Sequence, residues 1–144
     1  MDYEKSHRTY WLKKEISAES VKTTHRDYFL VDFFSDLNDV FEYLFAEGRE
    51  QFNYDWDRNA KHLIYRLLVN IGPNRKDTTT VAREMEIPLE IVEGMAKMYW
   101  YEIELFQAIF EREVEYIKRL APEDQMPAFE QLCSIVNNGN GKFL

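Results

Sequence analysis

The stretch PLEIVEGMAKMYWYEIELFQAIFEREVEYIKRL, residues 88–120, decides the fold class of this chain. Apolar side chains recur along it at steps of three and four residues, which is the period of an α-helix. Two such lines run side by side, one through Val92 and Ala96 and the other through Met95 and Met98. This wide apolar face predicts one long helix that packs against several neighbours.

The length of this helix has a consequence for the whole molecule. At ~1.5 Å per residue it would extend about 50 Å, whereas a compact domain of 144 residues has a radius of gyration of about 15 Å. We therefore expect either a kink within 88–120 or a second subunit that covers one end. On this ground the sequence predicts a homodimer.

Other segments with the helical period lie on both sides of this stretch. Their apolar spacing, and the threonine hydroxyls that supply an N-cap after the Gly72–Pro73 break, predict four further helices. These helices are predicted over residues 27–50, 55–71, 79–85 and 127–136. No stretch sustains the two-residue alternation of a β-strand. The chain is therefore predicted to be an all-α helical bundle of about five helices.

The domain organisation follows from the distribution of apolar residues. With 144 residues, 45% of them apolar, the chain is long enough for one hydrophobic core. Residues 27–138 are predicted to form a single helical domain. Residues 1–26 are expected to be a partly ordered arm, with a short helix around Tyr10–Val21 that depends on docking to the domain. The glycine-rich residues 139–144 are expected to be a flexible tail.

Charge and cysteine content limit the classes of function. The formal net charge is −8, and an acidic surface repels nucleic-acid phosphates unless basic residues are concentrated locally. The single cysteine, Cys133, is interpreted as a small buried apolar residue. The N-terminus lacks the apolar core of a signal peptide, and no apolar run reaches about 18 residues. We expect a cytoplasmic protein that does not contact a membrane.

Residues 79–98, TTVAREMEIPLEIVEGMAKM, have the layout of two short helices joined by a tight turn. The small side chain of Ala82 lets the helices cross closely, and Ile87 and Val92 hold the second helix on the first. The segment resembles the helix-turn-helix superfamily and, more distantly, the third region of sigma factors. That resemblance implies a helix-turn-helix corner and, as the alternative function, a DNA-binding transcription regulator.

Two features of this segment depart from the superfamily. Glu86 stands where most such units have glycine, and the exposed positions at the start of the second helix are Glu90 and Glu93. Reading base edges there calls for Arg, Lys, Asn, Gln or Ser. In the DNA-binding alternative, the basic and hydroxyl side chains near the corner contact phosphates. These residues are Arg75, Lys76, Thr78, Thr79 and Arg83.

No catalytic pattern is found. Glu4 and His7 have the i,i+3 spacing seen in di-iron bundles, but such sites need a second pair and two further glutamates. No GxxxxGK phosphate loop is present, and the serines lack the flanking glycines of a nucleophile elbow. The sequence therefore predicts a protein that is not an enzyme and that holds neither cofactor nor metal, although an enzyme of unidentified chemistry stays open as a third class.

Ordered carboxylates with interspersed aromatic residues resemble the phosphate pattern of DNA. We therefore expect an acidic helical face that binds the basic surface of a protein partner, one that acts on nucleic acid. A virus- or plasmid-encoded inhibitor that mimics DNA is compatible with this composition. The predicted contact residues are Glu90, Glu93, Trp100, Tyr101, Glu102, Glu104, Glu111, Glu113 and Glu115. Nucleic acid itself is a partner only in the helix-turn-helix alternative.

Overall fold

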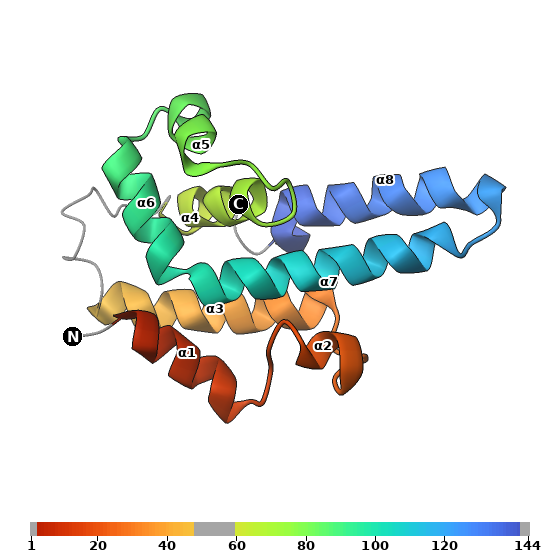
Figure 1. Ribbon diagram of the computed structural model, residues 1–144, viewed down its shortest axis with the longest axis horizontal. Helices are drawn as coiled ribbons and strands as arrows, with labels where there is room; N and C mark the ends of the chain where they lie inside the picture. The colour runs from red at the N-terminus through yellow and green to blue at the C-terminus, as the bar shows by residue number, and fades with distance from the viewer. Residues whose placement is uncertain (1–2, 48–59, 142–144) are drawn as a thin grey trace.

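The computed structural model describes residues 3–47 and 60–141. Over these ranges the chain is helical and contains no strand (Figure 1), which confirms the all-α prediction. The elements are α1 (Tyr3–Lys13), α2 (Ser20–Thr23), α3 (Leu30–Glu47), α4 (Ala60–Ile71), α5 (Thr78–Met85), α6 (Leu89–Met98), α7 (Trp100–Lys118), α8 (Pro122–Asn138) and the 3-10 helix η1 (Gly139–Gly141). The parts of the predicted helices within 48–59, and residues 142–144 of the tail, lie outside the described residues.

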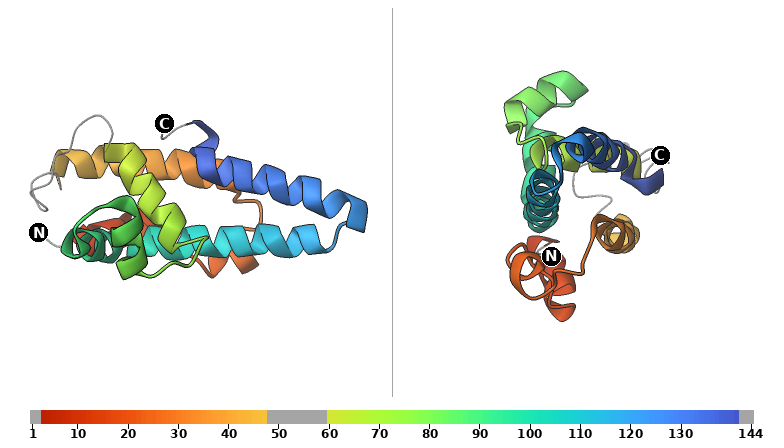
Figure 2. Two further views of the ribbon diagram at one scale, coloured as in Figure 1. Left: turned by 90° about the horizontal axis from the view of Figure 1, so that it is seen from above. Right: turned by 90° about the vertical axis from the view of Figure 1, so that its right-hand side faces the viewer.

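Helix α7 is the central element of the bundle. It contacts α1, α2, α3, α4, α6 and α8. Helix α8 runs back along it as a hairpin, while α5 and α6 form a separate corner at the opposite end (Figures 1 and 2). The wide apolar face predicted for this stretch is explained by the number of helices that α7 contacts.

Large aromatic rings fill the core around α7. The Phe106 ring lies 5.0 Å from the ring of Phe33, 5.9 Å from that of Phe34 and 6.0 Å from that of Tyr65. All four side chains are at most 2% exposed. The high aromatic content is therefore used largely for packing, which joins α3, α4 and α7.

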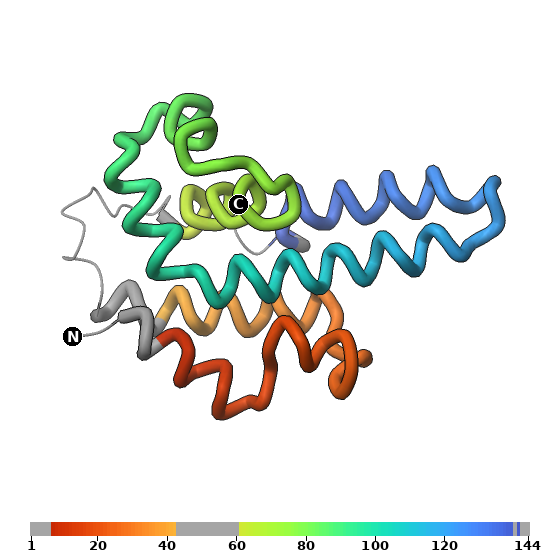
Figure 3. The backbone as a smooth tube through the Cα atoms, viewed as in Figure 1, coloured from red at the N-terminus to blue at the C-terminus, as the bar shows by residue number. Residues whose placement is uncertain are grey.

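The helix predicted over 88–120 is interrupted. Tyr99 separates α6 from α7 with φ −98° and ψ 19°, and the chain changes direction there (Figure 3). The buried ring of Tyr99 packs edge-on against the rings of His7 (4.8 Å) and Phe41 (5.7 Å). The bend accommodates the length within one chain, so the homodimer stays a prediction but loses the argument from helix length.

The N-terminal residues differ in detail from the sequence-based expectation. The helix expected around Tyr10–Val21 is wrong in position, because α1 ends at Lys13 and Glu15 adopts a left-handed conformation with φ 60°. The indole of Trp11 and the side chain of Val21 are both 0% exposed. These two anchors pack residues 3–26 against the bundle.

The last helix starts earlier than predicted. Helix α8 begins at Pro122, which occupies the first turn, where the missing N–H costs no hydrogen bond. Pro127, expected near the start, lies inside the helix. The side-chain amide of Gln125 donates to the carbonyls of Lys118 (3.4 Å) and Leu120 (3.0 Å). These bonds close the end of α7 and fix the α7–α8 hairpin.

Candidate functional site

Helices α5 and α6 form the tight corner predicted over 79–98. The Asp77 carboxylate caps α5 by accepting a hydrogen bond from the Thr80 amide at 2.7 Å, and this bond holds the pKa of Asp77 below its usual value. Glu86 turns the chain in the left-handed region, with φ 56° and ψ 44°. The Ile87 amide then donates to the Ala82 carbonyl at 3.0 Å. Glu86 thus adopts the conformation for which glycine is usually preferred.

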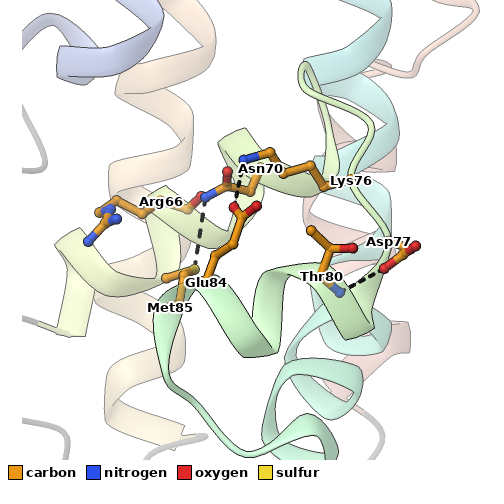
Figure 4. A network of polar contacts seen from close by, with 7 residues as sticks. All are labelled: Arg66, Asn70, Lys76, Asp77, Thr80, Glu84 and Met85. Carbon is orange, nitrogen blue, oxygen red and sulfur yellow. Dashed lines mark hydrogen bonds and ion pairs between the residues drawn. The ribbon is translucent and has the colours of Figure 1, made fainter.

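Polar contacts lie within α4, between α4 and α5, and between the loop that joins them and α5 (Figure 4). The side-chain amide of Asn70 donates to the Arg66 carbonyl at 2.8 Å and lies 3.9 Å from the Met85 sulfur. The Lys76 ammonium donates to the Glu84 carboxylate at 2.7 Å. Below these contacts Val81, Ile87 and Val92 are at most 5% exposed. Polar contacts and buried apolar side chains therefore hold the corner together.

The outer side of α6 and the start of α7 carry exposed side chains. They are spaced three and four residues apart, and we call them the corner face. Its members are Glu90, Glu93, Lys97, Trp100 and Glu104. The Trp100 side chain is 50% exposed. Among the side chains that the structure describes, no Lys or Arg forms an ion pair with the three glutamates. These carboxylates are therefore available to a partner.

Glu102 requires a correction, because the structure buries it completely, with 0% exposure. Its carboxylate accepts a hydrogen bond from Nε1 of Trp11 at 3.1 Å and forms a second one with Nδ1 of His7. Burying a carboxylate is unfavourable unless hydrogen-bond donors replace water, and α1 supplies both groups. Glu102 therefore anchors α1 to α7 and cannot be a contact residue for a partner.

The remaining predicted contact residues are engaged within the chain. The Tyr101 hydroxyl donates to the Ile16 carbonyl at 2.6 Å. Each of the three other carboxylates forms an ion pair within the chain: Glu111 with Lys22 (3.6 Å) and Arg75, Glu113 with Arg112 (3.4 Å), and Glu115 with Lys118 (3.2 Å). The acidic face is thus shorter than predicted and is centred on the bend.

Of the residues predicted to contact phosphates in the DNA-binding alternative, some are paired within the chain and others are exposed. Arg75 pairs with Glu111, and Lys76 pairs with Glu84. Thr78 is half-buried, whereas Thr79 and Arg83 are exposed on the outside of α5. Two of the three predicted phosphate-binding cations are therefore already neutralised by carboxylates of the same chain.

A buried polar cluster lies directly beneath the bend. It comprises His7 and Trp11 from α1, Tyr99 at the bend, and Glu102 from α7. The Tyr99 hydroxyl, Nε2 of His7 and Oε2 of Glu102 are buried and have no hydrogen-bond partner among the described groups. Burial, and secondarily the nearby Glu102 carboxylate, raise the pKa of Tyr99 above its usual value. This cluster joins α1 to the bend between α6 and α7.

Sequence reasoning did not identify this cluster. His7 and Trp11 are four residues apart, so they share one side of a helix, and that spacing is the only local signal. Their partner Glu102 is 95 positions from His7 and 91 from Trp11. No periodicity on either helix connects residues so far apart.

Among the residues with described positions, no group of three or more His, Cys, Asp or Glu side chains is arranged to hold a metal ion. None of the described helices is both long and apolar enough to cross a bilayer. Comparisons with protein-family models, with curated proteins and with solved structures find no match to this chain.

Proposed function

We propose that this chain is a non-enzymatic protein-binding protein whose corner face binds a basic surface on a protein that acts on nucleic acid. The contact residues are Glu90, Glu93, Trp100 and Glu104. Trp100 is the aromatic anchor, and the carboxylates around it provide charge complementarity to the partner. The form of this function that we favour is an inhibitor that mimics DNA and occupies the nucleic-acid-binding groove of its partner protein.

The observation that most supports the proposal is the exposure of the two glutamates at the start of α6. Glu90 and Glu93 are exposed, whereas Arg75 and Lys76 pair with the carboxylates of Glu111 and Glu84. This helix end presents two carboxylates of the same sign to solvent, and such a pair favours a cationic partner.

A helix-turn-helix DNA regulator is the second candidate, supported by the left-handed turn at Glu86 and by exposed Thr79 and Arg83 on α5. It is less favoured because the helix that would enter the major groove begins with carboxylates, which phosphates repel. The predicted homodimer is compatible with either candidate, and the described contacts within one chain do not depend on it.

Affinity capture with charge-reversed chains tests the proposal. Immobilised wild-type chain is expected to recover a nucleic-acid enzyme from an extract of the source cells. Glu90→Lys with Glu93→Lys should reduce recovery about tenfold or more, because like charges then face the basic partner. Trp100→Ala should also reduce it, through loss of the aromatic anchor.

The matched control reverses two exposed carboxylates on α8, Glu123→Lys with Glu130→Lys, which makes the same change in net charge away from the corner face. Recovery by this control should equal that of the wild type, and circular dichroism should show equal helicity for all variants. Equal loss in both charge-reversed chains would show that net charge alone governs capture, and the proposed site would be wrong.

A further inference from the structure

The α7–α8 hairpin extends beyond the start of α3 (Figure 1). Both α3 and α8 pack against α7, and an open groove lies between the three helices where α3 begins. Its volume is about 390 Å³, within the range of ligand and peptide sites. Its wall on α8 is formed by Ala128, Leu132 and Ile135, which have the three- and four-residue spacing of one helix face.

The rim of this groove exposes large apolar side chains. Phe29 is 50% exposed, Val31 53% and Tyr116 62%, and all three line the groove. Clustered exposure of this kind is unusual for a surface without a partner. The groove is bounded by α3, α7 and α8, so an added helix would complete a four-helix arrangement at this end of the bundle.

A second pocket adjoins the groove and supplies charge. It shares Phe29, Glu113 and Tyr116 with the groove and adds three arginines, Arg26, Arg112 and Arg119. The Arg112 guanidinium donates to the Val21 and Tyr28 carbonyls, at 2.8 and 2.6 Å, and so holds the segment before α3 against α7. It is committed to the fold.

The charges of this pocket do not cancel. Glu113 and Glu115 also line it, but Arg112 lies 3.4 Å from Glu113 and Lys118 lies 3.2 Å from Glu115. Arg26 and Arg119 are exposed and form no ion pair with a described carboxylate. On a chain of net charge −8, this is a locally cationic rim beside an apolar groove.

We propose that the groove between α3, α7 and α8 binds an amphipathic helix of a partner protein, with apolar residues toward the groove and acidic residues toward Arg26 and Arg119. Helix-in-groove recognition uses anchors at the three- and four-residue spacing that α8 presents. We assign acidic residues to the flank of the partner helix because they would pair with the exposed arginines of the rim, whereas an apolar face alone would leave those arginines without a partner. This site is distinct from the corner face and opposite to it in charge.

Fluorescence anisotropy with a designed probe tests the inference. The probe is a labelled, end-capped peptide of about 15 residues, long enough to form a helix on binding, with leucines on one face, glutamates beside them and alanines elsewhere. A matched probe carries lysines in place of the glutamates. The wild-type chain is expected to bind the acidic probe about tenfold or more tightly than the basic one, and added salt should weaken that binding.

Two variants locate the binding site. Arg26→Glu with Arg119→Glu should weaken binding of the acidic probe about tenfold or more, whereas Arg66→Glu, an exposed arginine on α4, should leave it unchanged. Val31→Glu on the groove rim should weaken binding of both probes. Equal affinity for the two probes, or equal loss in the Arg66 variant, would overturn the proposal. So would light scattering that shows a dimer abolished by Val31→Glu, because the occupant would then be a second copy.

Discussion

Two buried tyrosines show how single polar atoms differ in their contribution to this fold. The Tyr65 hydroxyl donates to the Val136 carbonyl at 2.5 Å and so ties α4 to the end of α8. The Tyr99 hydroxyl is equally buried but has no hydrogen-bond partner among the described groups. A buried hydroxyl that has lost its water and gained no partner destabilises the folded state.

Removing the two hydroxyls should therefore affect the free energy of unfolding differently. Tyr65→Phe is expected to lower the free energy of unfolding by about 1 to 2 kcal/mol, because the Val136 carbonyl loses its donor. Tyr99→Phe should leave the free energy of unfolding unchanged or raise it. Urea denaturation followed by circular dichroism measures both. A larger loss for Tyr99→Phe than for Tyr65→Phe would show that the Tyr99 hydroxyl stabilises the bend.

At the same scale, Glu102 shows the limit of sequence-based prediction. Its position beside the apolar line through Tyr99 and Ile103 is compatible with either a buried or an exposed side chain. Its burial depends on the donors of His7 and Trp11, which the fold brings from the other end of the chain. By contrast, Glu90 and Glu93 lie in the first turns of a helix whose inner side is occupied by Val92, and their exposure follows from local periodicity alone.

At the scale of elements, local signals predicted the corner, and the length of 88–120 predicted a kink as one of two alternatives, but neither gave the position of the bend. The caps and apolar spacing around Ala82, Ile87 and Val92 lie within a few residues of one another, so the α5–α6 unit can be read from its own sequence. The bend at Tyr99 has neither proline nor glycine at that position. It depends on the rings of His7 and Phe41, which come from α1 and α3. Tertiary packing therefore decides where the long helix is interrupted.

The loop that joins α4 to α5 contains a glycine, Gly72, that packs closely against backbone atoms of α4 and α7. A Cβ atom at Gly72 would lie 2.8 Å from the Leu68 carbonyl oxygen and 3.4 Å from that of Ile103. The side-chain amide of Gln107 on α7 also donates to the Gly72 carbonyl at 3.1 Å. Backbone atoms cannot move aside as a flexible side chain can, so this position requires glycine.

Gly72→Ala is accordingly expected to lower the free energy of unfolding by about 1 to 3 kcal/mol, the usual cost of overpacking a tight contact. Asn74→Ala, an exposed change in the same loop, should alter it by less than about 0.5 kcal/mol. Thermal and urea denaturation provide the measurements. A Gly72→Ala chain as stable as the wild type would mean that the backbone between Leu68 and Gly72 can shift without cost.

At the scale of the whole molecule, the bend places two surfaces of opposite charge at opposite ends of the bundle. The corner face presents three glutamates and one lysine around Trp100, whereas the groove beside the hairpin is bordered by Arg26 and Arg119. The sequence indicated the first surface, although it extended it too far along α7. It did not indicate the second, because residues of three helices meet there only in the folded chain.

We propose that the corner recognises a protein and not DNA. Fluorescence anisotropy of a labelled, mixed-sequence DNA duplex, titrated with the wild-type chain at low salt, distinguishes the two. We expect no binding, because phosphates meet the exposed carboxylates of α6 while Arg75 and Lys76 are paired within the chain. Salt-sensitive binding that is lost in Arg75→Ala with Lys76→Ala would instead establish the corner as a DNA-binding unit.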